Sequence, residues 1–134
     1  MTLVDSNVLA DVLTGDPVWL TWSVEALDRR AALGPLFINE IIYSELSVRS
    51  DSPKALEGHL VALRVVLERT PKEALFLAGK VFRRYRSAGG VRTGVLPDFF
   101  IGAHAQVARL PILTRDVQRY RTYFPDVKLI TPKS

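Results

Sequence analysis

The sequence contains no cysteine, which excludes disulfide bonds, thiolate zinc sites and cysteine nucleophiles. It also has no apolar run of about 18 residues, the minimum for a transmembrane helix. The first residues include Asp5 and lack the basic segment and uninterrupted apolar core of a secretory signal. These absences fit a reducing compartment, and we expect a cytoplasmic protein with no membrane-bound part.

Internal repeats, low-complexity tracts and glycine–serine linkers are absent too, which favours a single domain over residues 1–134. That length is enough to bury a hydrophobic core. Histidine is scarce: only His59 and His104 are present, and they fall in different predicted helices. We interpret both as ordinary helix residues rather than as metal ligands or general bases.

The charge balance is mildly basic, with 18 Lys and Arg against 14 Asp and Glu and a net charge of +4. Such an excess is compatible with a nucleic-acid partner but is common among enzymes that have none. Candidate RNA contacts are Arg86, Arg92 and Arg115. Arginines at the end of a helix are also favoured by the helix dipole, so their position alone does not identify an RNA site.

Short apolar segments alternate with amphipathic ones, a pattern typical of a parallel sheet covered by helices on both faces. Ser6 or Asn7 can cap the first helix, and Asn39 can cap the third. We expect an α/β fold with three α/β/α layers and a short, mostly parallel sheet of about four or five strands. The expected strands are residues 2–4, 36–38, 111–114 and 127–130, and the expected helices are residues 6–13, 18–33, 40–48, 53–68, 71–85, 98–109 and 117–123.

Three aspartates lie where strands end or helices begin. Asp5 directly follows the first strand, Asp116 lies two residues past a later one, and Asp98 begins a helix. Open α/β sheets bind ligands outside the carboxyl ends of their strands. We therefore expect these three side chains on one edge of the sheet.

Asp98 has two possible roles. It stands in the stretch VLPDFFIGAHA, where Pro97 and Asp98 precede an apolar helix. A carboxylate in this position can cap the helix by accepting backbone N–H bonds. It can equally belong to a chemical site, and this motif alone does not separate the two interpretations.

Glu40 and Glu45 share one predicted helix but cannot share one site, because five residues place their side chains about 140° apart around the axis. Glu45 lies four residues after Ile41 and three after Ile42, so it points along the apolar face. Glu40 falls in the first turn, where the helix dipole favours an acid. Glu45 is therefore the unusual residue, an acid directed at the core.

Four acids without an obvious neutralising Lys or Arg remain: Asp5, Glu45, Asp98 and Asp116. Two carboxylates about 5 Å apart repel by about 3 kcal/mol at an effective dielectric of about 20. A convergent set would have to keep protons or bind a cation. Oxygen ligands suit Mg²⁺ or Mn²⁺, which can activate water beside a phosphodiester.

Four segments, in order, closely resemble the PIN-domain ribonucleases, and in particular the VapC-type toxins of toxin–antitoxin modules. They are LVDSNVL from Leu3, IIYSEL from Ile41, PDFFIGAHA from Pro97 and LTRDVQRYRTYFP from Leu113. The resemblance implies a Mg²⁺- or Mn²⁺-dependent endoribonuclease that cleaves tRNA, rRNA or mRNA. Its acidic quartet would be Asp5, Glu45, Asp98 and Asp116, supported by Ser6, Asn7 and Thr114.

The resemblance also implies protein partners. These are a VapB-like antitoxin that blocks the site with a cation of its own, and a second copy in a homodimer. Operator DNA would be contacted only through the antitoxin. The apolar faces of residues 18–33 and 53–85 are the expected docking surfaces.

The remaining acids and the tryptophans have simpler interpretations. We expect Trp19 and Trp22, three residues apart on one helix, to be core or interface residues. The other aspartates are expected in solvated turns and helix faces, namely Asp11, Asp16, Asp51 and Asp126.

Two alternative functions stay open. A haloacid-dehalogenase-like phosphohydrolase needs a second Asp two residues after its nucleophile, but here that residue is Asn7, and no lysine follows a suitable later strand. A non-catalytic PIN-like binding module would have to tolerate the repulsion of four acids without a metal. RNA and phosphatase substrates, tested with and without EDTA, would separate the three possibilities.

Overall fold

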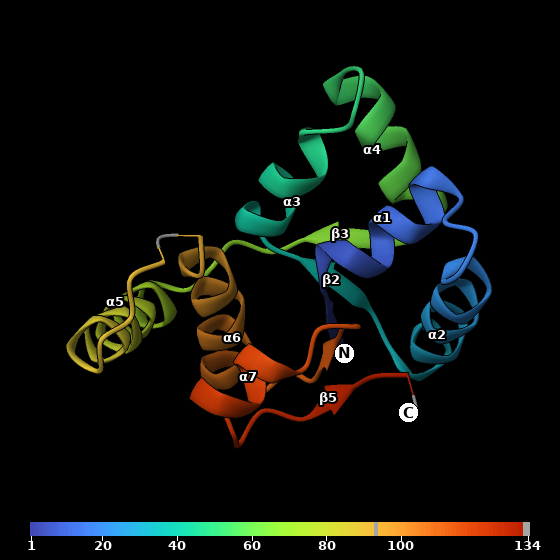
Figure 1. Cartoon of the computed structure of the whole chain (residues 1–134). Coiled ribbons are helices and arrows are strands. Elements are labelled where there is room, and N and C mark those ends of the chain that lie inside the picture. The colour runs from blue at the N-terminus through green and yellow to red at the C-terminus, as the bar shows by residue number, and fades with distance from the viewer. Residues whose placement is uncertain (93, 133–134) are drawn as a thin grey trace.

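The computed structural model of the chain describes residues 1–92 and 94–132. Its centre is one parallel sheet in the order β3-β2-β1-β4-β5, so the predicted α/β class and the size of the sheet are confirmed (Figure 1). The strands are β1 (Thr2–Val4), β2 (Leu36–Ile38), β3 (Val65–Leu67), β4 (Ile112–Leu113) and β5 (Leu129–Ile130).

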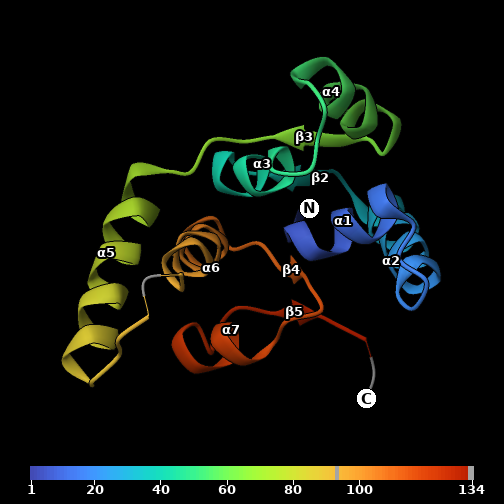
Figure 2. The same ribbon diagram turned by 45° about the horizontal axis from the view of Figure 1, so that its top comes forward.

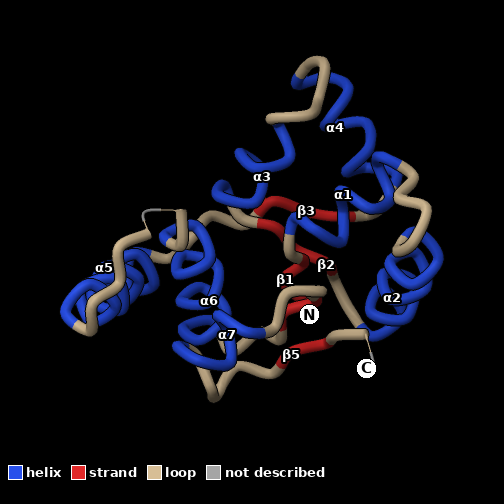
Figure 3. The backbone as a smooth tube through the Cα atoms, in the orientation of Figure 1, coloured by secondary structure: helices blue, strands red, loops and turns tan. Residues whose placement is uncertain are grey.

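Helices cover the sheet on both sides, which gives the expected three layers (Figure 3). The chain runs outward through β1, β2 and β3 and then returns to β4 and β5. Since parallel crossovers are right-handed, this reversal places the early helices on one face and the later ones on the other. The helices are α1 (Ser6–Thr14), α2 (Leu20–Leu33), α3 (Glu40–Ser47), α4 (Pro53–Ala62), α5 (Lys72–Ser87), α6 (Leu96–Ala108) and α7 (Gln118–Tyr123).

The core lies on both faces of the central strands. Leu3 on β1 is paired with Phe37 on one side and Ile112 on the other, and the side chains of Leu3 and Ile112 have no solvent exposure. Strands buried on both faces are apolar throughout rather than alternating, as this sequence shows. No helix in the described part of the chain is long and apolar enough to cross a membrane.

α6 is the most deeply packed helix, with α5 on its outer side (Figure 2). α7 packs against it through Phe124 and Gly102. A Cβ atom at position 102 would lie 2.3 Å from Cδ2 of the Phe124 ring, so this contact requires glycine. Gly102 therefore sets how closely α7 approaches α6.

One predicted element is wrong. The expected helix 53–68 ends at Ala62, Arg64 adopts a left-handed φ of 60°, and residues 65–67 form the edge strand β3. The β-branched Val65 and Val66 favour an extended chain, and pairing with β2 supplies the backbone hydrogen bonds that a helix would otherwise provide. The other predicted elements are present, with ends shifted by up to two residues.

Candidate active site

The sheet has a topological switch point between its neighbouring strands β1 and β4. From β1 the chain leads through α1 and α2 to β2, whereas from β4 it leads through α7 to β5 on the opposite side. The two connections diverge and leave a crevice at the carboxyl ends of the strands, where such sheets bind ligands. Asp5 immediately follows β1, and Thr114 immediately follows β4.

Asp5 occupies the floor of this crevice and is 4% exposed. Its Oδ1 accepts a hydrogen bond of 2.8 Å from the backbone N–H of Ser6, so Asp5 is the N-cap of α1. The prediction that Ser6 or Asn7 caps this helix is therefore wrong. Burial raises the pKa of the Asp5 carboxyl, and hydrogen bonds from Thr114 and Tyr120 partly offset this effect.

Tyr120 is a site residue that the sequence did not reveal. Its hydroxyl donates a hydrogen bond of 2.9 Å to Oδ2 of Asp5, and Thr114 Oγ1 donates one of 2.8 Å to the same oxygen. Burial raises the pKa of the Tyr120 phenol well above its ordinary value, and the nearby Asp5, Asp98 and Glu45 add to the shift. A tyrosine in a short amphipathic helix looks like any core residue, so no local signal identified its role.

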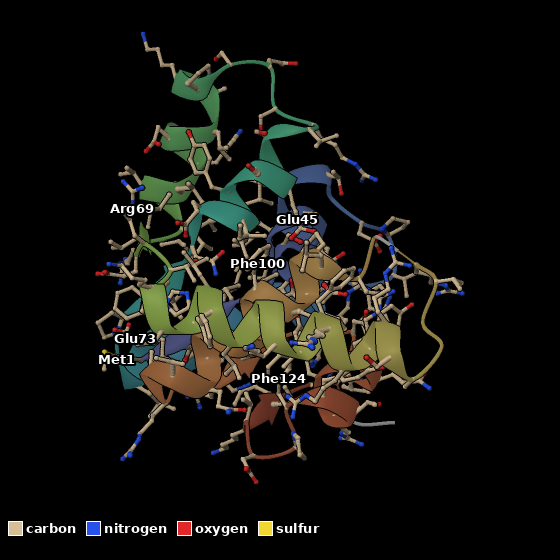
Figure 4. The ribbon with its side chains drawn as sticks, turned by 90° about the vertical axis from the view of Figure 1, so that its left-hand side faces the viewer. Met1, Glu45, Arg69, Glu73, Phe100 and Phe124 are labelled. Carbon is tan, nitrogen blue, oxygen red and sulfur yellow. The ribbon has the colours of Figure 1, made fainter. Side chains whose placement is uncertain are left out.

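Glu45 reaches the crevice from α3. Its Oε1 accepts a hydrogen bond of 3.0 Å from Ser6 Oγ. Burial raises the pKa of Glu45, and the charges of Asp5 and Asp98 raise it further, which places the three carboxyls near one another. Figure 4 shows Glu45 on α3, which packs against α6. Glu40 instead accepts a hydrogen bond of 2.8 Å from the Thr70 backbone N–H, so the predicted separation of the two glutamates is confirmed.

Asp98 lies in the first turn of α6 but does not cap it. The helix begins at Leu96, the N-cap position is Val95, and no side chain caps this end. The Asp98 carboxylate accepts a hydrogen bond from Arg119 on α7 and forms an ion pair with it. Burial and the neighbouring Asp5 raise the pKa of Asp98 to about 6, although Arg119 lowers it. The interpretation of Asp98 as a helix cap is therefore wrong.

Asp116 stands at the exposed rim of the crevice. Its charge contributes to the raised pKa of both Asp5 and Asp98, so it lies close to them. Its backbone N–H donates a hydrogen bond of 3.0 Å to Thr114 Oγ1, which joins the Asp116 loop to Asp5. The four acids named from the sequence thus come from four different elements to one crevice.

Asn7 completes the hydrogen-bond network around Asp5. Its Nδ2 donates hydrogen bonds of 3.2 Å to Thr114 Oγ1 and 3.5 Å to Asp5 Oδ2. Its Oδ1 accepts a hydrogen bond of 3.1 Å from the backbone N–H of Arg115. Ser6, Asn7 and Thr114, the predicted supporting residues, therefore all contact an acid of the crevice or the loop that carries one.

The three arginines proposed to contact RNA lie in different settings. Arg115 forms hydrogen bonds of 2.7 and 2.9 Å with both oxygens of Asp11, beside the crevice. Arg86 lies in the last turn of α5 with its guanidinium 5.3 Å from the centre of the Phe82 ring, and Arg92 is exposed in the loop before α6. The expectation that Asp11 is solvated is wrong, since it is 3% exposed and bonded to Arg115.

The carboxyl oxygens fit a hard cation in their chemistry, since the crevice offers no sulfur ligand. In the present arrangement each of three carboxylates is bonded to a protein donor: Asp5 to Thr114 and Tyr120, Glu45 to Ser6, and Asp98 to Arg119. Within residues 1–92 and 94–132, no three acidic or histidine side chains are grouped as a ready-made metal cage. Arg119 occupies one oxygen of Asp98, so it would compete with a cation for that oxygen.

Comparison with known proteins agrees with this fold. The model of the PIN domain family matches residues 2–125. The fold is similar to that of VapBC2 from Rickettsia felis bound to a promoter DNA fragment, with a TM-score of 0.72, 16% identity and 98% of both chains covered. A toxin–antitoxin complex from Klebsiella pneumoniae gives a TM-score of 0.71 and 23% identity over 100% of this chain and 99% of the other. FitAcB from Neisseria gonorrhoeae gives a TM-score of 0.66 and 19% identity, with 98% of both chains covered. No functionally curated protein sequence matches the chain.

Proposed function

The chain belongs to the PIN-domain family, and we propose that it is a metal-dependent endoribonuclease acting as the toxin of a toxin–antitoxin pair. The observation that carries the proposal is the meeting of Asp5, Glu45 and Asp98 at the switch point of the sheet. All three have a raised pKa, and in Glu45 and Asp98 the charge of a neighbouring carboxylate contributes to it. Such mutual repulsion is relieved when a cation binds.

The proposed ligands of Mg²⁺ or Mn²⁺ are Asp5, Glu45, Asp98 and Asp116. When bound, such an ion lowers the pKa of a coordinated water and neutralises charge on a phosphodiester. The residues around the acids would orient them. Thr114 and Tyr120 fix Oδ2 of Asp5, Ser6 holds one oxygen of Glu45, and the buried floor keeps bulk water away from Asp5.

The toxin role is supported by the solved structures that share this fold, which include several toxin–antitoxin complexes. Under this proposal the chain binds an antitoxin, pairs with a second copy, and reaches operator DNA only through the antitoxin. Apolar side chains available for such contacts are exposed on α2, α4 and α5, namely Leu20, Val24, Val61 and Phe76. A cavity of about 220 Å³ beside Val24, Leu27 and Leu63 offers a place for an apolar side chain of a partner.

The proposal is tested by incubating purified protein with labelled tRNA, rRNA and mRNA, with Mg²⁺, with Mn²⁺ or with EDTA. We expect cleavage with either ion and none with EDTA. Asp98→Asn keeps the size of the side chain and removes its charge, so it should fold and should not cleave. RNA cleavage by this variant at the wild-type rate would refute the site.

Two further measurements separate the alternatives. Hydrolysis of a phosphate monoester with intact RNA would indicate a phosphohydrolase, and RNA binding without cleavage would indicate a binding module. Sedimentation of the protein alone, and with a small protein encoded next to it, tests the homodimer and the antitoxin. A stable monomer with no such neighbour would contradict the toxin role.

A further inference from the structure

A second feature adjoins the acidic crevice. A cavity of about 510 Å³ lies between α1 and the segment formed by α3, α4 and the turn joining them. Ser6, Asn7 and Glu45 belong both to its wall and to the crevice, so the cavity lies directly beside the acids, although Asp5, Asp98 and Asp116 do not line it. Its volume is large enough for a nucleoside, because small-molecule sites begin at about 300 Å³.

The wall of this cavity is rich in hydrogen-bond acceptors. It carries the carboxylates of Asp11, Asp16, Glu45 and Asp51 but only two guanidinium groups, those of Arg49 and Arg115. Asp11 and Arg115 satisfy each other through two hydrogen bonds, and Asp16 Oδ1 accepts hydrogen bonds from the backbone N–H groups of Val18 and Trp19. This leaves Asp51, Glu45 and the second oxygen of Asp16 with the single guanidinium of Arg49. A phosphate group would be repelled here, whereas an uncharged group that donates hydrogen bonds would be matched.

Arg115 gives the cavity a rigid planar edge. Asp11 accepts hydrogen bonds from Nε and Nη2 along one edge of the Arg115 guanidinium, and the Trp19 ring centre lies 4.9 Å from its central carbon. Asp11 is itself buried and accepts a hydrogen bond of 2.7 Å from Ser23. Trp19 covers one face of the guanidinium, so a flat aromatic ring would stack on the opposite face, where little side-chain freedom remains to be lost.

We propose that this cavity is a nucleobase subsite, which holds the base next to the scissile phosphate and prefers bases with an exocyclic amino group. The amino group donates to the carboxylates of the wall, and the base lies against Arg115. Cytosine and adenine carry an exocyclic amino group, whereas uracil has none and donates only through one ring N–H group. The cavity should therefore prefer cytosine and adenine to uracil. This inference rests on the proposed ribonuclease function and names the substrate feature that the same site would read.

The chain supplies its own reporter for the experiment. His59 on α4 lines the cavity, whereas His104 is buried on α6 and bonded to Asn39, away from it. With only two histidines in the sequence, the ring signals of both can be followed separately by NMR. Cytidine and uridine are the matched probes because they differ only at C4 and N3 of the base.

We expect cytidine and adenosine to shift the His59 signals and to leave those of His104 unchanged. Their dissociation constants, taken from these shifts, should be about tenfold lower than that of uridine. A tenfold ratio corresponds to the loss of one hydrogen bond to a charged group. Asp51→Asn should reduce the difference in dissociation constant between cytidine and uridine. The matched control is Asp126→Asn, which changes an exposed acid in the turn before β5 and should leave that difference as it is in the wild type. Equal shifts with uridine, or no shift of His59, would overturn the subsite.

RNA cleavage is measured separately on the same wild-type protein. If RNA is cleaved and cytidine fails to shift His59, the subsite is wrong and the ribonuclease function stands. If cytidine shifts His59 selectively and RNA is never cleaved with either metal, the ribonuclease function is wrong while the base-binding cavity is confirmed.

Discussion

The hydroxyl of Tyr120 on α7 donates a hydrogen bond of 2.9 Å to Oδ2 of Asp5 at the end of β1. Tyr120 is 1% exposed, so water cannot take the place of its hydroxyl without a rearrangement of the packing. The bond joins the most buried acid of the crevice to a helix 115 residues further along the chain. It makes the position of Asp5 depend on how α7 is packed.

Replacing Tyr120 by Phe removes this donor and keeps the ring. We expect the free energy of unfolding to fall by about 1–2 kcal/mol, because a buried carboxyl oxygen loses one of its partners. Urea denaturation at pH 7.5 measures the change. Tyr123→Phe is the control: its ring lies 4.9 Å from that of Phe99, and its hydroxyl makes no hydrogen bond within the described residues. Equal losses in both variants would mean that Tyr120 contributes only through ring packing.

The stability of the metal-free protein should depend on pH through Asp98. Its pKa in the folded protein is about 6, above the unfolded value of about 4. Folding therefore raises the proton affinity of Asp98, and this contributes to the free energy of unfolding. The contribution is complete below about pH 4 and is lost as the pH rises through about 6. In EDTA, the free energy of unfolding of the wild type should fall between these pH values and level off above them.

Asp98→Asn isolates this contribution, since the other acids are present in both proteins. At pH 7.5 in EDTA the variant should be more stable than the wild type by roughly 1–2 kcal/mol, a value reduced for the partial exposure of Asp98. At pH 4 the difference should vanish. A variant less stable than the wild type at both pH values would show that Asp98 acts mainly through its ion pair with Arg119.

Arg119 should compete with the metal for Asp98. Arg119→Gln removes the ion pair, and we expect the dissociation constant for Mn²⁺ to fall about fivefold, the equivalent of a partly exposed pair of about 1 kcal/mol. Titration calorimetry at pH 7.5 measures it. Arg121→Gln, on the exposed side of the same helix, controls for net charge and should leave the constant unchanged. Weaker binding by Arg119→Gln would show that Arg119 positions Asp98 for the ion.

The contact between α6 and α7 is tested by two glycine substitutions. Gly102→Ala places a methyl group against the Phe124 ring and should lower the free energy of unfolding by about 2–3 kcal/mol. Gly79→Ala on α5 meets no atom within 4 Å and should raise it by about 0.5–1 kcal/mol, since alanine favours a helix. Thermal unfolding of both variants gives the comparison. A tolerated Gly102→Ala would mean that α7 can move outward freely.

Local patterns were sufficient to predict most of the fold. The segments at Thr2–Val4 and Leu36–Ile38 are apolar except for Thr2, and Asp5 and Asn39 follow them directly, so their burial as strands could be predicted. β3 could not, because Val65–Leu67 continues the pattern of the preceding helix and becomes a strand only through its pairing with β2. That pairing depends on residues about 30 positions earlier, beyond any local window.

The same distinction holds for the crevice. Asp5 and Asp98 could be named because strand ends and helix starts are local features. Arg119 and Tyr120 could not, because their contacts with these acids arise from the docking of α7 against α6. Asp11 looked like a solvated helix residue, since its partner Arg115 lies 104 residues away in the sequence.

The hydrogen bonds of Asp5 have a consequence for the order of events during protein synthesis. Asp5 leaves the ribosome well before Thr114 and Tyr120, which follow it by 109 and 115 residues. Until the segment from Thr114 to the end of α7 has emerged and docked, Oδ2 of Asp5 has only the long 3.5 Å hydrogen bond from Asn7, and Arg119 and Asp116 are absent from the crevice as well. The acid crevice can therefore be complete only after α7 has been synthesised. Under the proposed function, the fully synthesised domain is then the form that can cleave RNA and the form that an antitoxin must bind.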